Sequence, residues 1–169
     1  MPLRIRQEIQ AVSRAAGVSD AARPVVPVVP VVPVVPVVAA AIVDRAGAVL
    51  IAQRPPGKHL AGRWEFPGGK VAAGEPDLIA LARELAEELD IDLSREAGPP
   101  EHLLTLRHDY PDRCIELRCF LVPHFIGAAR ALDGQRLKWV APAALDAEDI
   151  LEADRPFIET LQRRLAVAR

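Results

Sequence analysis

The sequence predicts a domain of the α/β class, in which strands and helices alternate along the chain. Half of the 169 residues are hydrophobic and 26% are charged, as in an ordinary globular protein that buries a large core. Two apolar segments flank the turn at Asp44–Gly47, and an amphipathic helical pattern follows at Pro76–Leu89. Two more strand-like segments come after that helix. This mixed order favours a layered α/β architecture.

The first elements are two strands, expected at Val34–Val43 and Ala48–Arg54. A loop rich in glycine and proline covers Arg54–Gly74 and leads into the helix. We then expect strands at His102–Tyr110 and Arg113–Val122, a short strand at Leu137–Val140 and a closing helix at Arg155–Ala166. The dipeptide Pro111–Asp112 makes the turn between the two longer strands.

The residues before the first strand form a separate low-complexity segment. Five tandem Pro-Val-Val units run from Pro24 to Val38, and the apolar run continues to Val43. A membrane helix is excluded because a proline in every third position removes helical hydrogen bonds, whereas a three-residue period fits polyproline II. We therefore expect a tail at residues 1–33 and a folded domain at 34–169. The units are either a stiff linker merging into the first strand or a functionless repeat expansion.

Composition limits the partners of the chain. A net charge of −2 argues against a sequence-independent grip on duplex nucleic acid, and four per cent aromatic residues against a stacking platform. We expect a small-molecule ligand, no nucleic-acid polymer, no membrane and a monomer. The two cysteines, Cys114 and Cys119, fit a reducing cytoplasm and should face opposite sides of one strand as buried, unpaired residues.

Three carboxylates gather on one face of the predicted helix. Glu84, Glu87 and Glu88 fall within an arc of about 100° at helical spacing. Their mutual repulsion would be relieved by Mg²⁺, which prefers oxygen ligands and often bridges to phosphates. The alternative is a solvated acidic face. The opposite face carries the leucines Leu78, Leu81, Leu85 and Leu89.

A glycine pair precedes this helix in the segment Glu65–Lys70. Glycines let the backbone approach a ligand closely, and Lys70 can neutralise a phosphate oxygen. The alternative is a loop that only turns tightly. Glu75 follows, directly before Pro76, a residue suited to a first helical turn.

The combined spacing resembles the Nudix box. Gly69 is followed after five residues by Glu75 and after seven more by the run Arg83-Glu-Leu-Ala-Glu-Glu-Leu-Asp-Ile91. The box normally has glycine where this chain has Asp90. We expect Asp90 to adopt the left-handed conformation at the helix end, at a cost of roughly 1 kcal/mol.

Further segments resemble the MutT branch of that family, the 8-oxo-dGTP diphosphatases, over residues 34–166. They include Arg54-Pro-Pro-Gly, Trp64–Lys70, Tyr110-Pro-Asp-Arg113, Asp133-Gly-Gln135 and Ala153-Asp-Arg-Pro156. This resemblance implies an α/β/α sandwich around a mixed β-sheet. It also implies Glu84 as general base and metal ligands from Glu84, Glu87, Glu88 and the carbonyl of Gly68.

The resemblance assigns the remaining site residues as well. Asp133 stands where the branch has a glutamate ligand and is one methylene shorter, so its direct coordination is open. Arg54 and Arg113 would contact phosphate, base or sugar. Asp154 would read the purine edge, and Arg83 would orient a glutamate through a salt bridge.

The function implied is hydrolysis of 8-oxo-dGTP to 8-oxo-dGMP and pyrophosphate with Mg²⁺, for which Mn²⁺ can substitute. Two alternatives remain at this point. One is a Nudix hydrolase of another nucleotide, such as a normal dNTP, CTP or a dinucleoside polyphosphate. The other is a noncatalytic module that binds a damaged base.

Overall fold

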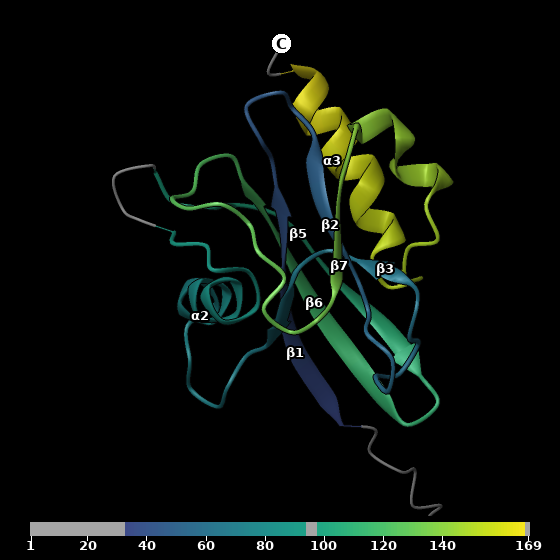
Figure 1. The fold of residues 1–169 in the computed structure, drawn as a ribbon. Coiled ribbons are helices and arrows are strands. Elements are labelled where there is room, and N and C mark those ends of the chain that lie inside the picture. The colour runs from purple at the N-terminus through teal and green to yellow at the C-terminus, as the bar shows by residue number, and fades with distance from the viewer. Residues whose placement is uncertain (1–32, 94–97, 168–169) are drawn as a thin grey trace, which may run out of the picture. The chain divides into compact units, whose positions relative to one another are not determined.

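The computed structural model of the chain describes residues 33–93 and 98–167. The predicted N-terminal tail and the first three Pro-Val-Val units lie outside this part. The described residues belong to one compact unit. Figure 1 shows its elements in chain order: β1 (Val34–Ile42), β2 (Val49–Gln53), β3 (Trp64–Glu65), β4 (Gly68–Lys70), α2 (Asp77–Leu89), β5 (Glu101–Tyr110), β6 (Arg113–Val122), β7 (Arg136–Val140), a 3₁₀ helix η2 (Pro142–Ala147) and α3 (Arg155–Val167).

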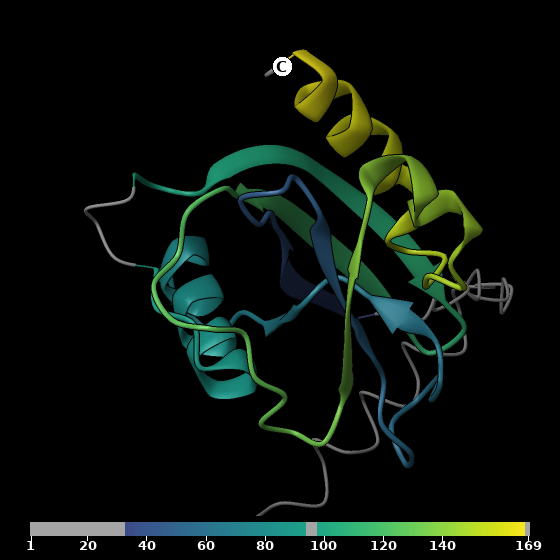
Figure 2. The same cartoon turned by 45° about the horizontal axis from the view of Figure 1, so that its top comes forward.

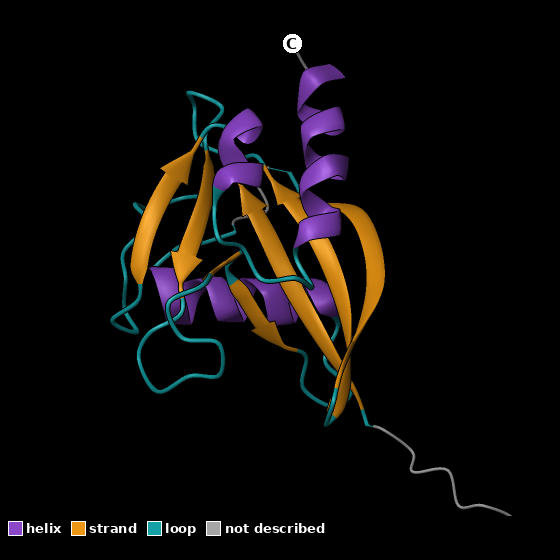
Figure 3. Cartoon of the chain, turned by 90° about the vertical axis from the view of Figure 1, so that its right-hand side faces the viewer, coloured by secondary structure: helices purple, strands orange, loops and turns teal. Residues whose placement is uncertain are grey.

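The strands of this unit form two sheets between two helical layers. One sheet is mixed, in the order β4-β1-β6-β5, and its β1 and β6 run parallel. The other is antiparallel, in the order β3-β2-β7. Helices α2 and α3 lie on opposite sides of the sheets (Figure 2), and α2 runs across the strands while α3 stands beside them (Figure 3). The predicted α/β sandwich is confirmed, with its strands divided between two sheets.

Strand β1 is buried on both faces, which explains its unbroken apolar sequence. One face packs with α3 around Ala39 and Ala41, together with Phe157, Ile158 and Leu161. The other face packs with α2, through the residues Val38, Ala40, Ile42, Leu81, Leu85 and Leu89. Every residue from Val38 to Ile42 is at most 3% exposed. The alanines keep the strand thin enough for a helix on each side.

The last Pro-Val-Val units enter β1, as one of the two interpretations of the repeat predicted. A proline inside a central strand is unusual because it lacks a ladder donor. Pro36 is tolerated because its carbonyl accepts from the amide of Val71 at 3.0 Å, so its missing N–H lies on the same side. The pairing of β1 with β4 ends beside Pro36, at the pair Val37 and Lys70. The ladder between β1 and β6 continues past Pro36 without a break.

Helix α2 begins after Pro76 and ends at Leu89. Leu81, Leu85 and Leu89 are fully buried, as expected. Leu78 is 40% exposed instead, because the buried face of α2 begins at Ala80 and Leu81. Asp90 has φ 58° and ψ 33°, so the expected left-handed conformation is confirmed. Its amide donates to the carbonyl of Ala86, closing the helix.

The predicted loop at 54–74 contains two strands that sequence analysis did not anticipate. β3 and β4 have two and three residues, too few to show a strand period. The 3₁₀ helix Pro142–Ala147 was not anticipated either. Cys114 and Cys119 are buried and free, as expected. Among the described residues, no helix is long and apolar enough to span a membrane.

Candidate active site

The glycine pair is required by two close approaches. Gly68 has φ +148°, and a Cβ there would lie 2.1 Å from the carbonyl oxygen of Val38 in β1. A Cβ on Gly69 would lie 2.3 Å from the carboxylate carbon of Glu84. The first contact lets β4 pair with β1, and the second places the loop backbone directly against the acidic helix. The interpretation of this segment as only a tight turn is therefore insufficient.

Arg83 organises the start of the site through two carboxylates. Its guanidinium donates to Glu75 Oε1 and Oε2, both at 2.9 Å, and to Glu84 Oε1 at 2.8 Å. It also donates to the Lys70 carbonyl at 3.1 Å. The hydrogen bonds from Arg83, with one from the Ala72 amide, lower the pKa of Glu75 to about 2. Arg83 thus makes the expected salt bridge, and it ties the glycine loop to α2.

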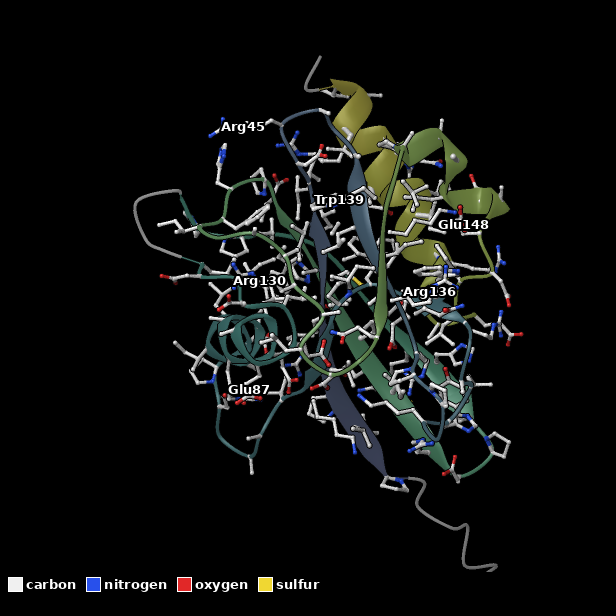
Figure 4. All side chains as sticks on the ribbon, viewed as in Figure 1. Arg45, Glu87, Arg130, Arg136, Trp139 and Glu148 are labelled. Carbon is white, nitrogen blue, oxygen red and sulfur yellow. The ribbon has the colours of Figure 1, made fainter. Side chains whose placement is uncertain are left out.

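The three helix carboxylates do not converge as the sequence pattern suggested. Glu84 lies against Gly69 with its side chain 16% exposed, whereas the side chain of Glu87 is 63% exposed and 3.5 Å from Arg83. Figure 4 shows Glu87 at the outer surface of α2. Glu88 lies on the side of the helix that meets the 130–135 loop. Among the described residues, no three acidic, histidine or cysteine side chains form a closed metal-binding group.

The 130–135 loop brings Asp133 to Glu88 by capping α2. The last carbonyls of a helix lack partners within the helix. Here the Glu88 carbonyl accepts from the Leu132 amide at 3.0 Å and from Gln135 Nε2 at 2.8 Å. Gln135 in turn accepts from the Asp133 amide at 2.8 Å and is only 8% exposed. The cap therefore fixes Asp133 beside the acidic end of the helix.

Glu88 is a partly buried carboxylate that is influenced by more negative than positive groups. Burial, followed by the nearby charges of Glu65, Glu84 and Asp133, raises the pKa of Glu88 to about 7, while Lys58 opposes the shift. A set of carboxylate and carbonyl oxygens with unbalanced negative charge suits a hard divalent cation. Glu84, Glu88 and Asp133 are the predicted ligands that the structure brings within electrostatic reach of one another. Glu87 and the Gly68 carbonyl stay predictions.

A second group of polar residues lies beyond β3. Asp154 is 5% exposed, and its Oδ2 accepts from the Phe66 amide at 3.0 Å. Burial raises the pKa of Asp154 to about 7, since the hydrogen bond from Phe66 and the charge of Arg54 offset it only in part. Burial, with the charge of Asp154, raises the pKa of Tyr110, while the charge of Arg54 opposes the rise.

Arg113 completes this second group from the start of β6. Its guanidinium lies 6.0 Å from the ring centroid of Tyr110. Its buried Nε makes no hydrogen bond in the described part of the chain, and its nearest carboxylate oxygen is Asp112 Oδ1 at 3.5 Å. Both Arg113 and Asp154 act electrostatically on Tyr110, so each lies in its vicinity.

Arg54 and Glu65 connect the two groups. Arg54 Nη1 forms an ion pair with Glu65 Oε2, across the β2–β3 pairing. The charge of Glu65 contributes to the raised pKa of both Glu88 and Asp154, so Glu65 lies within electrostatic reach of both groups. Lys70 is exposed at the end of β4. Sequence reasoning assigned no role to Glu65, Lys58 or Tyr110, although Glu65 and Tyr110 stood within quoted motifs.

Comparison with known proteins agrees with this geometry. The sequence model described as NUDIX domain matches residues 38–160, well over half of the chain. The chain belongs to the NUDIX family. Its glycine pair, Glu75 and the acidic helix are therefore the parts of the family's box, as the resemblance implied.

Two curated relatives and one solved structure illustrate where the chain lies within the NUDIX family. It is 40% identical over 120 residues to the CTP pyrophosphohydrolase of Escherichia coli (strain K12), covering 71% of this chain and 86% of the relative. It is 45% identical over 132 residues to the putative 8-oxo-dGTP diphosphatase 2 of Mycobacterium tuberculosis, covering 75% and 87%. The solution structure of the E. coli ORF135 protein is 36% identical, with a TM-score of 0.69 and coverage of 82% and 94%.

These similarities make the chain a MutT-like NUDIX hydrolase, in agreement with the resemblance noted in its sequence. The alternative of a noncatalytic base-binding module loses its support, because the acidic helix, Arg83 and the glycine pair are all in place. NUDIX hydrolases generally act with a divalent metal, and the donor set around Glu88 fits one.

Proposed function

We propose that this NUDIX hydrolase cleaves 8-oxo-dGTP to 8-oxo-dGMP and pyrophosphate in the presence of Mg²⁺, with Mn²⁺ as a substitute. The observation that carries the proposal is the ion pair between Arg54 and Glu65, which connects the acidic site on α2 with the polar site at Asp154. An acidic site on α2 suits a metal and a triphosphate, and a buried polar site at Asp154 suits a base. We propose further that the chain acts as a monomer on free nucleotides in the cytoplasm.

The residues of the acidic site position the reaction. Bound Mg²⁺ would screen the triphosphate and lower the pKa of an attacking water. Glu84 is held by Arg83 against Gly69, and its carboxylate would take the proton from that water. Glu87, Glu88, Asp133 and the Gly68 carbonyl would hold the metal. Lys70 would bind phosphate oxygens through its positive charge, and Arg113, beside Tyr110, would contact the base or sugar.

Asp154 would select the base. Oxidation at C8 turns guanine N7 into a donor, while O6 stays an acceptor. A carboxyl with a pKa of about 7 exists in both forms near neutral pH, so it can accept from N7–H and, when protonated, donate to O6. Normal guanine offers an N7 lone pair instead, which leaves the buried carboxyl unmatched.

CTP is a second candidate substrate, favoured by the similarity to the CTP pyrophosphohydrolase. The cytosine edge also presents a donor, its amino group, beside an acceptor, its ring N3. The same protonated Asp154 would match that pair. We rank it second because the other curated relative with a comparable match is a putative 8-oxo-dGTP diphosphatase, at 45% identity.

A substrate panel tests the proposal. We expect kcat/KM for 8-oxo-dGTP to exceed that for dGTP and CTP, with monophosphate and pyrophosphate as products. Asp154→Ala should lower the discrimination between 8-oxo-dGTP and dGTP at least tenfold, mainly through KM, whereas Asp154→Asn should retain much of it because an amide offers both a donor and an acceptor. A preference for CTP in wild-type protein would select the second candidate, and an unchanged ratio in Asp154→Ala would remove Asp154 from base recognition.

A further inference from the structure

The loop between β2 and β3 is held in one conformation by its own hydrogen bonds. The Arg54 amide donates to the Arg63 carbonyl, and the Gly62 amide donates to the Arg54 carbonyl, each at 2.9 Å. Arg54 Nε also donates to the His59 carbonyl at 2.6 Å. Leu60 has φ 58°, which a branched side chain rarely adopts. Such backbone persists where the surroundings impose it, and it is concentrated at functional sites.

This loop carries Lys58 to the acidic site. Lys58 Nζ lies 3.5 Å from Asp133 Oδ2, and each side chain is 48% exposed. Its positive charge also acts on Glu88 and Glu65, where it opposes in part the rise in pKa that burial causes. An exposed ion pair of this length contributes little to stability, so stability does not account for the placement. The contact instead brings a cation to the carboxylates that suit a metal.

We propose that Lys58 is a phosphate-binding residue of this hydrolase, held on Asp133 until metal and nucleotide occupy the site. The proposal rests on the function given above. Without metal, Lys58 partly balances the charges of Glu88 and Asp133. Once a metal ion binds those carboxylates, the ammonium group of Lys58 loses Asp133 as its partner. The phosphate oxygens of the nucleotide then take the place of Asp133. Lysine suits this exchange because its flexible stem carries a point charge.

The proposal predicts two effects of opposite sign. Replacing Lys58 by methionine keeps most of the side-chain volume but removes the charge. Metal should then bind more tightly to the substrate-free protein, because a competing cation has gone. The triphosphate should bind more weakly, because a phosphate contact has gone. A loop that only supports the fold would weaken both.

Lys138→Met is the matched control. Lys138 pairs with Glu148, and its side chain is 47% exposed, but its ammonium lies over the ring of Trp64 rather than beside the acidic site. Lys58→Arg serves as a second variant that keeps the charge. Circular dichroism and urea unfolding show whether each variant is folded, and wild-type turnover of 8-oxo-dGTP tests the proposed function separately.

The experiment measures Mn²⁺ binding to substrate-free protein by EPR and binding of α,β-methylene-dGTP with Mg²⁺ by calorimetry. For Lys58→Met we expect Mn²⁺ to bind about three- to tenfold more tightly, as loss of a nearby like charge implies. The analogue should bind at least fivefold more weakly to Lys58→Met. Lys58→Arg should keep most of the wild-type affinity for the analogue. The proposal would be overturned if Lys58→Met bound Mn²⁺ and the analogue as Lys138→Met does, or if it bound both more weakly. Either result would count against it even if wild-type protein hydrolyses the nucleotide.

Discussion

Gly69 lies so close to Glu84 that no side chain fits between them. A Cβ built on Gly69 would meet the Glu84 carboxylate carbon at 2.3 Å and both of its oxygens within 2.6 Å. The backbone at Gly69 does not have a positive φ, so the conformation itself does not demand glycine. The requirement comes from the carboxylate, which Arg83 holds from its other side at 2.8 Å.

Gly69→Ala should therefore reduce catalysis more than it reduces stability. The methyl group displaces the Glu84 carboxylate, and a displacement of about 1 Å at a reacting group can lower kcat about a hundredfold. Gly74→Ala is the control, since Gly74 has φ +77° and open space around it. That control should lose about 1 kcal/mol of stability with little change in kcat. Equal turnover in the two variants would contradict the role given to the Gly69–Glu84 contact.

Glu88→Gln and Glu87→Gln should each lower kcat by orders of magnitude in a folded protein. Both remove a charged oxygen from the proposed metal site. Glu88→Gln should also raise the free energy of unfolding at pH 8, because burial disfavours the charge that the wild-type residue carries there. Glu159→Gln, an exposed carboxylate on α3, is the control. Near wild-type turnover in both site variants would mean that the acidic face is merely solvated.

Asp154 should make stability depend on pH. Its folded pKa of about 7 lies above the ordinary value of 3.8. Between about pH 4 and pH 7 the folded protein then binds one more proton than the unfolded chain, so the free energy of unfolding falls as pH rises. The full loss is on the order of 4 kcal/mol. Asp154→Asn should make this slope shallower, while the raised pKa of Glu88 still contributes to it, and the variant should be more stable than wild type at pH 8. Urea unfolding at pH 5 and pH 8 would show both effects. Equal slopes in the two proteins would contradict the burial of an ionisable Asp154.

Asp90→Gly should stabilise the chain modestly. Asp90 holds φ 58° at the end of α2, where glycine pays no steric cost. The gain should be about 0.5–1 kcal/mol in urea unfolding, because the 3.4 Å ion pair with Arg130 that it removes is exposed and weak. Activity should stay within twofold of wild type. A destabilised variant would show that the Asp90 side chain contributes more than its backbone costs.

Local patterns predicted the long elements because each carries several periods. The face of α2 could be predicted from the leucines Leu81, Leu85 and Leu89, and the left-handed end from Asp90. Strands β3 and β4 could not be predicted, since two or three residues are too few to show an alternating pattern. Their positions depend on contacts with β1 and β2, which are distant in the sequence.

Only part of the acidic site could be predicted, because only its helix carries a local sequence pattern. Helical spacing brought Glu84, Glu87 and Glu88 onto one helix, but it could not show that Arg83 draws Glu87 toward solvent. The approach of Lys58 to Asp133 joins two loops 75 residues apart and leaves no trace in local spacing. The role of Glu65 as a link between the two groups likewise depends on tertiary structure.

The most direct test of the central claim is the metal dependence of pyrophosphate release from 8-oxo-dGTP. Purified protein would be stripped with EDTA, assayed, and assayed again after Mg²⁺ or Mn²⁺ is added, with monophosphate and pyrophosphate counted separately. We predict no turnover without metal, and equal amounts of the two products when it is restored. Full activity in the stripped protein, or release of inorganic phosphate in place of pyrophosphate, would contradict the account.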